Sequence, residues 1–165
     1  LNTTCNITVL TSSVPAPWKL DDIKDNKASA YYNEGIFIIE GGGSDIWNGS
    51  DQFAFLNQDA GKDHSISARI LSQPNTDPWA KTGLMFREST SSNSKFVLIC
   101  ITPGNGISLQ WRDSTGGNCE KIVIGCKFCR QECPPDVLFR LHCPVHGHIV
   151  IFLGCLCIDR QQKNE

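Results

Sequence analysis

The apolar residues of this chain occur in short runs separated by Gly, Pro, Asn and Asp, and the 3.6-residue period of a helix is nearly absent. Runs of this length between turn residues predict β-strands. We expect nine of them, at 35–41, 52–58, 65–73, 81–89, 94–102, 106–114, 121–126, 136–143 and 148–158. Short turn sequences such as "TPGNG" favour hairpins. The pattern therefore predicts an all-β, mainly antiparallel sandwich or barrel.

Alternation within the strands assigns residues to faces. In "ISLQWRD", Leu109 and Trp111 alternate with Gln110 and Arg112, and in "TGLMFRE" the cationic Arg87 lies with small and apolar residues. We expect the apolar face to point into the core and the mixed face to form an open, polar, concave surface that could hold a sugar or a peptide. The alternative is that these polar side chains only coat a solvated sheet.

The length of 165 residues suits one domain with a real core, since such a chain buries roughly 70% of its unfolded surface. We expect an N-terminal extension at 1–16, a sandwich at 17–158 with a Cys-rich final third, and a polar tail at 159–165. A net charge of −2 without a basic stripe argues against nucleic acid as a partner. No apolar run reaches the roughly 20 residues of a membrane span.

Acceptor tripeptides for N-glycosylation stand at Asn2, Asn6 and Asn48, and the chain has nine cysteines. Both features favour an oxidising compartment, so we expect a secreted or cell-surface protein. The start "LNTTCNITVL" lacks the charged and apolar regions of a signal peptide, so the chain is either a mature form or not exported.

The cysteines permit two interpretations. Cys126, Cys129, Cys143 and His146 have the paired spacing of a tetrahedral zinc site. Disulfides are favoured over zinc because clustered thiols pair in an oxidising compartment. The disulfide candidates are Cys5, Cys119, Cys126, Cys129, Cys133, Cys143, Cys155 and Cys157. Because nine is odd, one cysteine should be free or bonded to another chain, and Cys100 in an apolar strand is the expected buried free thiol.

Sugar binding requires an aromatic platform with polar side chains beside it. The candidate ligand-binding residues are Trp47, Trp79, Arg87, Gln110 and Arg112. Alternatively, Trp79 pins its loop and Trp47 staples a Gly-rich segment to the sandwich.

Catalysis and metal binding receive less support from the sequence. No pair of strand carboxylates has glycosidase spacing and nothing marks one nucleophile, so we expect no enzymatic activity. Asp45, Asn48 and Asp51 offer hard oxygen ligands for Ca²⁺, but this signal is weak. Neither calcium nor zinc is favoured as a cofactor.

A longer stretch resembles a known family. The motifs are "PWKLDDI", "DIW" with a following Asp and Phe, "SQPNTDPWAKTGLMFRES" and "TPGNGISLQWR", over about residues 17 to 117. They resemble the regulation-of-enolase-like family (DUF1349) of the concanavalin A-like lectin/glucanase superfamily. The resemblance implies a jelly-roll sandwich of two antiparallel sheets, used as an accessory or carbohydrate-binding-like module on secreted and cell-surface proteins.

The chain departs from the family pattern after "VLFRL", because the Trp-bearing strand and the last strand are missing from "CIDRQQKNE". An unclosed sandwich exposes a sheet edge, so we expect self-association through that edge or through the odd cysteine. The favoured function is an extracellular, non-catalytic, carbohydrate-binding-like or structural surface glycoprotein. The alternatives are a self-assembling subunit without a ligand and an intracellular, zinc-stabilised regulatory domain.

Overall fold

The computed structural model describes residues 13–24, 27–61, 64–124, 137–143, 149–151, 154–155 and 157–158. These residues form sixteen strands and no helix, and all their ladders are antiparallel except one. The prediction of an all-β, mainly antiparallel sandwich is therefore confirmed. None of the described segments forms a helix of the length and apolarity that a membrane crossing needs.

The largest sheet follows the order β12-β11-β10-β9-β14-β7, with β15 also paired to β9. Its strands are β7 (Asp59–Ala60), β9 (Thr82–Arg87), β10 (Phe96–Thr102), β11 (Gly106–Arg112), β12 (Glu120–Ile124), β14 (Ile149–Ile151) and β15 (Gly154–Cys155). From β9 to β12 the chain runs as a meander, because each strand pairs antiparallel with the next one in sequence. Strand β12 is the end of this sheet in the described part of the chain.

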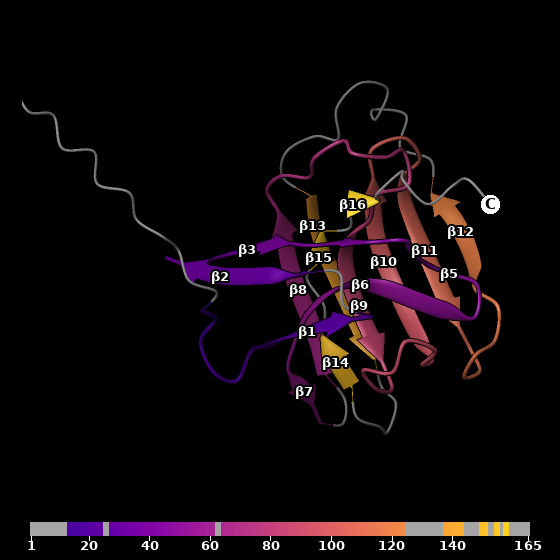
Figure 1. The fold of residues 1–165 in the computed structure, drawn as a ribbon, viewed down its shortest axis with the longest axis horizontal. Helices are drawn as coiled ribbons and strands as arrows, with labels where there is room; N and C mark the ends of the chain where they lie inside the picture. The colour runs from indigo at the N-terminus through magenta and orange to yellow at the C-terminus, as the bar shows by residue number, and fades with distance from the viewer. Residues whose placement is uncertain are drawn as a thin grey trace, which may run out of the picture.

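Smaller sheets cover the large one. Strands β1 (Lys19–Ile23), β6 (Ser50–Asn57) and β5 (Asp45–Trp47) form a three-stranded sheet that crosses in front of β9 to β11 in Figure 1. The remaining pairs are β8 (His64–Ile70) with β13 (Val137–Cys143), β2 (Ser29–Asn33) with β3 (Ile36–Glu40), and β4 (Gly42–Gly43) with β16 (Cys157–Ile158).

Two hydrophobic clusters lie on opposite faces of β9 and β10. The first contains Ile23, Ile46, Phe53, Phe55, Met85, Phe96, Leu98 and Cys100. The second contains Ala60, Ile66, Ile70, Leu84, Phe86, Ile101 and Phe139. Because each buried large side chain stabilises the fold by about 1.5–3 kcal/mol, both layers contribute substantially. Strand β9 is buried along its whole length, which explains why its sequence carries no polar face.

The two faces of β11 do not lie as the sequence predicted. Gln110 and Arg112 are on the face that the β5–β6 layer covers, and they are 0% and 1% exposed. Leu109 and Trp111 alternate with them and lie on the opposite face, where they are only half-buried. The polar face is the inner one because β6 carries a charged partner into the interior.

All nine predicted strands exist, but the last one is broken. The segment predicted at 148–158 contains β14, β15 and β16, and its first two strands pair with β9. The C-terminal segment therefore returns to the large sheet, where it pairs with β9. Five strands were not predicted, and β4, β5 and β7 among them have two or three residues each.

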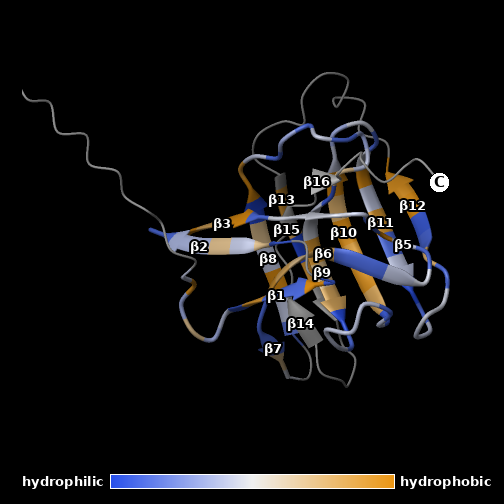
Figure 2. Ribbon diagram, viewed as in Figure 1, coloured by the Kyte–Doolittle hydropathy of each residue, from blue (hydrophilic) through white to orange (hydrophobic). Residues whose placement is uncertain are grey.

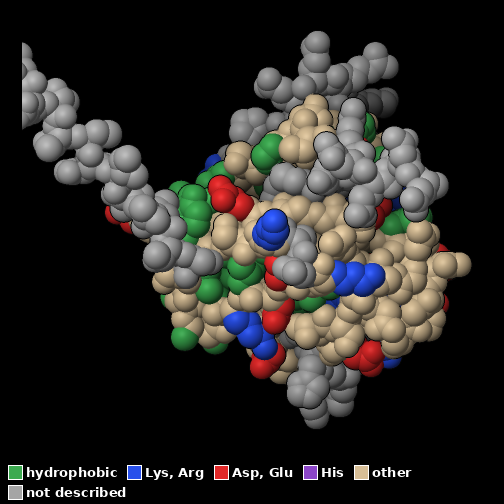
Figure 3. All heavy atoms as spheres, viewed as in Figure 1, with side chains coloured by type: hydrophobic (Ala, Val, Ile, Leu, Met, Phe, Trp, Pro, Cys, Tyr) green, Lys and Arg blue, Asp and Glu red, His purple; other side chains and the backbone are tan. Residues whose placement is uncertain are grey.

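The surface in Figure 3 carries scattered basic and acidic side chains, and its hydrophobic side chains gather over β2 and β3. In Figure 2, β12 changes from hydrophilic to hydrophobic along its length. Ile122 and Ile124 of β12 are 54% and 52% exposed. This outward apolar strand is unusual beside the otherwise mixed surface.

Substituting Ala for Gly83 should destabilise the sandwich. A Cβ atom on Gly83 would lie 2.0 Å from the Ile99 carbonyl oxygen and 2.6 Å from the Cys100 Cα atom, and backbone atoms cannot yield as a side chain can. We expect Gly83→Ala to lower the free energy of unfolding by at least about 2 kcal/mol, measured by urea denaturation. Gly61→Ala is the control, since the nearest atom there is His64 Nε2 at 3.2 Å. Equal stability of the two variants would contradict this packing.

Candidate functional site

Two carboxylates fasten the β5–β6 hairpin to the large sheet. Asp45 at the start of β5 accepts from the ammonium group of Lys81, and Asp51 in β6 accepts from Arg87 and Arg112. Asn48 forms the turn between the strands with a positive φ of 49°. The hairpin is thus held on both sides of its turn, and this fixes the position of Trp47 between the two pairs.

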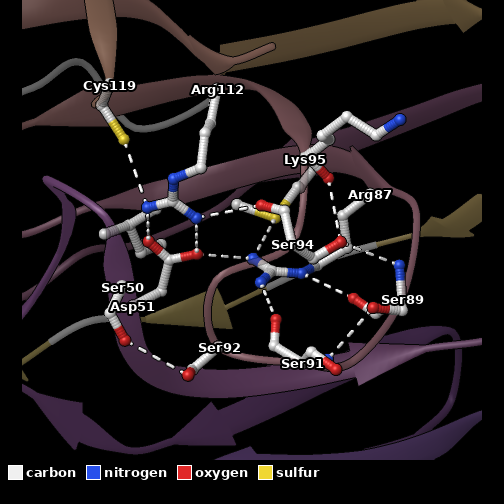
Figure 4. A network of polar contacts seen from close by, with 12 residues as sticks. Ser50, Asp51, Arg87, Ser89, Ser91, Ser92, Ser94, Lys95, Arg112 and Cys119 are labelled. Atoms are coloured by element: carbon white, nitrogen blue, oxygen red, sulfur yellow. Dashed lines mark hydrogen bonds and ion pairs between the residues drawn. The ribbon is translucent and has the colours of Figure 1, made fainter. Parts of the chain in front are cut away.

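The Asp51 carboxylate is shared by two buried guanidinium groups (Figure 4). Arg112 binds it in a bidentate manner, with Nη2 2.6 Å from Oδ1 and Nη1 2.9 Å from Oδ2. Arg87 Nη1 donates to Oδ2 at 2.8 Å. The three side chains have no exposed surface. They carry two positive charges and one negative charge, so the cluster has a net charge of +1 inside the protein.

Main-chain carbonyl groups accept the remaining guanidinium hydrogens. Arg112 donates to the carbonyl oxygens of Asn48, Ser94 and Gly117 at 2.7–3.1 Å. Arg87 donates to the carbonyl oxygens of two serines in the loop that follows β9, Ser89 at 2.8 Å and Ser91 at 2.5 Å. These contacts place negative dipole ends around the excess positive charge.

Aromatic faces and a thiol complete the surroundings of the arginines. The Arg112 guanidinium carbon lies 4.9 Å from the Phe96 ring centroid, and that of Arg87 lies 5.4 Å from the Phe53 centroid. Such cation–π contacts contribute about 0.5–2 kcal/mol each. The Cys119 sulfur lies 3.4 Å from Arg112 Nη2 and donates to the Asn48 carbonyl.

The environment moves the pKa values of these groups. Burial lowers the pKa of Arg87, because desolvation outweighs the attraction of Asp51. Burial also opposes the charge of Arg112, but its bidentate contact with Asp51 outweighs this and raises its pKa. Burial raises the pKa of the Cys119 thiol despite the nearby Arg112 charge. Cys119 is therefore a neutral donor in the network.

The structure consequently corrects the predicted location of Arg87, Gln110 and Arg112. We expected them on an open polar face, but all three are buried, and Asp51 and main-chain carbonyls occupy the guanidinium donors. Gln110 donates to Ser108 Oγ at 3.2 Å, also inside the protein. A ligand cannot reach these three side chains in this structure. They can affect a surface site only by fixing the position of the strands and loops that they contact.

The two remaining candidates, Trp47 and Trp79, come together with Lys121. The Lys121 Nζ atom lies 3.7 Å from the Trp79 ring centroid and 5.1 Å from the Trp47 ring centroid. Both indoles are half-buried and Lys121 is exposed. We call these three residues the aromatic platform. They come from β5, the loop before β9, and β12, so the fold brings together residues that are far apart in sequence.

The loop that carries Trp79 is held by hydrogen bonds. Asp77 accepts from the Trp79 amide through Oδ1 at 2.7 Å and from the Ala80 amide through its carbonyl at 3.0 Å. The Pro78 carbonyl accepts from the Gly104 amide and the Asn105 side chain. The loop is thus tied to the β10–β11 hairpin, and Trp79 projects from a fixed backbone.

Lys81 lies in the protein interior beside Trp47 of the platform. Its side chain is buried, and its ammonium donates to the Asp45 carboxylate and, at 2.8 Å, to the Ile46 carbonyl. The same ammonium lies 5.7 Å from the Trp47 ring centroid. Trp47 is therefore close to two cationic groups, of which only Lys81 has a carboxylate partner among the described residues.

An open pocket of about 340 Å³ lies elsewhere, between the end of β1 and the β9–β10 loop. Its lining is Asp21, Asp22, Ile23, Lys24, Thr90 and Ser92. It has polar groups but no aromatic ring to stack against a sugar. In the described ranges, no three His, Cys, Asp or Glu side chains gather as a metal site. Asp45 and Asp51, considered above for Ca²⁺, are both engaged by cationic side chains.

The structure describes only some of the residues in the cysteine and glycosylation predictions. Cys100 is a buried free thiol as predicted, and burial raises its pKa to about 12. Cys119, a predicted disulfide candidate, is also a free thiol. Asn48 is exposed at its turn, as a glycan acceptor must be.

The other predicted positions are not described at side-chain level. Cys143, Cys155 and Cys157 lie in strands whose backbone alone is described. Those outside the described residues are Asn2, Asn6, Cys5, Cys126, Cys129, Cys133 and His146.

Sequence reasoning missed Lys121, Lys81 and the role of Asp51. Lys121 stands in an ordinary strand sequence, and only the register of β11 with β12 brings it beside the tryptophans. Asp45 and Asp51 flank Trp47 in the sequence, but the cationic partners of these two carboxylates lie more than 30 residues away along the chain.

Comparison with other proteins did not extend this description. No protein-family model, curated protein or solved structure matched the chain. The assignment of a function therefore rests on the site itself.

Replacing Asp51 by Asn should strongly destabilise the fold. The change keeps the size of the side chain but leaves two buried guanidinium groups without a counter-charge. Breaking a buried pair costs about 3–5 kcal/mol, and we expect a loss of that order in urea denaturation. Glu88→Gln is the control, because Glu88 pairs with Lys95 at the surface and such a pair contributes about 0–1 kcal/mol. A loss below about 1 kcal/mol in Asp51→Asn would contradict the structural role.

Proposed function

We propose that this protein is a non-catalytic carbohydrate-binding module that uses the aromatic platform. The observation that carries the proposal is the meeting of two half-buried tryptophans, Trp47 and Trp79, around the exposed ammonium of Lys121. The resemblance to the concanavalin A-like superfamily agrees with this function and with a jelly-roll form of the sandwich. The exposed acceptor Asn48 and the many cysteines support a secreted or cell-surface location.

The chemistry of sugars explains why this arrangement suits them. A pyranose ring presents C–H groups on one face, which pack on the electron-rich face of an indole, and hydroxyl groups at its edge, which need polar partners. Trp47 and Trp79 supply the rings, and Lys121 supplies three donor hydrogens beside them. The ion pairs of the β5–β6 hairpin support binding, because they hold Trp47 in place and little entropy is lost there when a ligand binds.

Non-catalytic binding fits the state of the nearby carboxylates. Cleavage of a glycosidic bond needs a general acid and a nucleophile or base that face one bond. Asp45 is neutralised by Lys81, and Asp51 is buried under two arginines. The platform thus offers contacts for holding a sugar, and we assign it no hydrolytic step.

Removing one indole should weaken sugar binding while the fold persists. We expect Trp79→Ala and Trp47→Ala each to weaken binding to an immobilised oligosaccharide panel by at least about fivefold, because a lost aromatic contact is worth about 1 kcal/mol or more. Trp111→Ala is the matched control, since Trp111 is also half-buried but lies on the opposite face of β11. Circular dichroism confirms folding of each variant. The proposal would be refuted if only Trp111→Ala lost binding, or if the wild-type protein bound none of the oligosaccharides.

A second candidate function is self-assembly, and β12 favours it. This strand ends the large sheet in the described part of the chain, and its outward residues Ile122 and Ile124 are more than half exposed. Free strand edges pair with other strands. A second copy of β12 fits because a two-fold axis would place the same apolar strand against itself.

Charges on this edge should prevent such assembly. We expect wild-type protein in reducing buffer to form dimers by analytical ultracentrifugation, and the double variant Ile122→Lys, Ile124→Lys to be monomeric, since apposed ammonium groups repel. Ile36→Lys is the control, because Ile36 is 45% exposed on the separate β2–β3 hairpin. A wild-type monomer across the concentration range would exclude the candidate. The reducing buffer removes any contribution of intermolecular disulfides.

A further inference from the structure

The charges of the platform are unbalanced. Lys81 and Asp45 neutralise each other, whereas Lys121 adds one positive charge. In the described chain, no carboxylate oxygen lies within the 4.0 Å of an ion pair from Lys121, and its ammonium makes no hydrogen bond there. In the described residues, its ammonium faces the two indole rings, at 3.7 and 5.1 Å from their centroids. The side chains of Asp45, Lys81 and Lys121 together therefore carry a net charge of +1, while the Asp77 carboxylate is engaged with the Trp79 amide.

An ammonium held by aromatic rings keeps its hydrogens available. The ring faces attract the cation electrostatically, but they provide no acceptor for its three donors. An anionic oxygen placed at the rim could accept these hydrogens and form a charge-assisted hydrogen bond of about 2.7–2.9 Å. This bond is stronger than one to a neutral hydroxyl group. The position therefore discriminates between anionic and neutral ligands.

The surrounding side chains strengthen this preference. Lys81 is the second cation near Trp47, and it forms an ion pair with Asp45. The Asp45 carboxylate is therefore not free to pair with Lys121. Because Lys121 is exposed on an edge strand, it can move off the Trp79 ring without disturbing the core. The indole faces then become free for the sugar ring while the ammonium stays beside them.

We propose that the aromatic platform binds acidic saccharides, with Lys121 as the residue that recognises their anionic group. This inference rests on the proposed carbohydrate-binding function and deepens it. The ligand class is a sugar ring that carries a carboxylate or a sulfate. The ring stacks on Trp47 and Trp79, and the anionic substituent accepts hydrogen bonds from Lys121.

Matched ligands separate this inference from the proposed function. The probes are oligosaccharides of uronic acids, the same oligosaccharides after reduction of their carboxyl groups to neutral alcohols, and sulfated and unsulfated forms of one neutral oligosaccharide. Each pair shares the ring and differs in the charge. The proteins are wild type, Lys121→Gln, Trp79→Ala and the control Lys95→Gln. Lys95 is a surface lysine that pairs with Glu88 at 2.9 Å and lies outside the platform.

We expect wild type to bind at least one acidic form about tenfold more tightly than its neutral counterpart, which corresponds to about 1.4 kcal/mol. The preference should shrink as salt rises, because exposed charges are screened. Lys121→Gln should lose the preference but retain the neutral binding, Trp79→Ala should lose both, and Lys95→Gln should behave as wild type. The carboxylated and sulfated pairs show which anion the site takes.

Each opposing result has a distinct meaning. Equal binding of acidic and neutral forms by wild type, or a preference that survives in Lys121→Gln, overturns the acidic-saccharide inference and leaves carbohydrate binding intact. If Lys95→Gln loses the preference as well as Lys121→Gln, the preference for acidic forms comes from the overall charge of the protein, and the inference is also overturned. Binding of no saccharide by folded wild-type protein overturns the proposed function itself.

Discussion

One carboxylate, that of Asp51, fastens the layers of this sandwich together. It lies on β6 of the front sheet and binds Arg87 of β9 and Arg112 of β11, so it connects the front sheet to two strands of the large one. Because two guanidinium groups share it, removing Asp51 leaves two buried positive charges without a counter-charge. The excess positive charge is tolerated because turn carbonyls and the Phe96 ring face it. Asp51, Arg87 and Arg112 therefore form a connected network, which specifies how β6 must lie on the large sheet.

The position of the aromatic platform follows from that constraint. The β5–β6 hairpin is held at Asp51 and again at Asp45, and Trp47 lies between these points. The register of β11 with β12 places Lys121 opposite Gln110, on the inner side of the sheet rim. The hydrogen bonds of Asp77 hold the loop of Trp79. Interior electrostatics, sheet register and loop geometry thus determine the position of one surface, so buried residues influence the proposed binding site without contacting a ligand.

The sequence predicts the strands well because period-two patterning and turn residues are local signals, and all nine predicted segments contain strands. It misassigns the faces of β11, because alternation separates Gln110 and Arg112 from Leu109 and Trp111 but does not say which set is inside. That choice depends on Asp51, which is more than 60 residues away along the chain. Of the predicted site residues, the fold brings the two tryptophans together around Lys121. Lys121 could not be found from sequence, since its role arises only from the pairing of β11 with β12.

The buried arginines hold the turns by their main chain. Arg112 and Arg87 bond to the carbonyl oxygens at Asn48, Ser94, Gly117, Ser89 and Ser91, and a carbonyl oxygen is present whatever the side chain at that position. The turns can therefore change their outward side chains during evolution while their anchoring stays the same. The side chains of three neighbouring loops at one end of the sandwich can therefore vary while the backbone that carries them stays fixed. Other scaffolds acquire new specificities by loop variation in the same way.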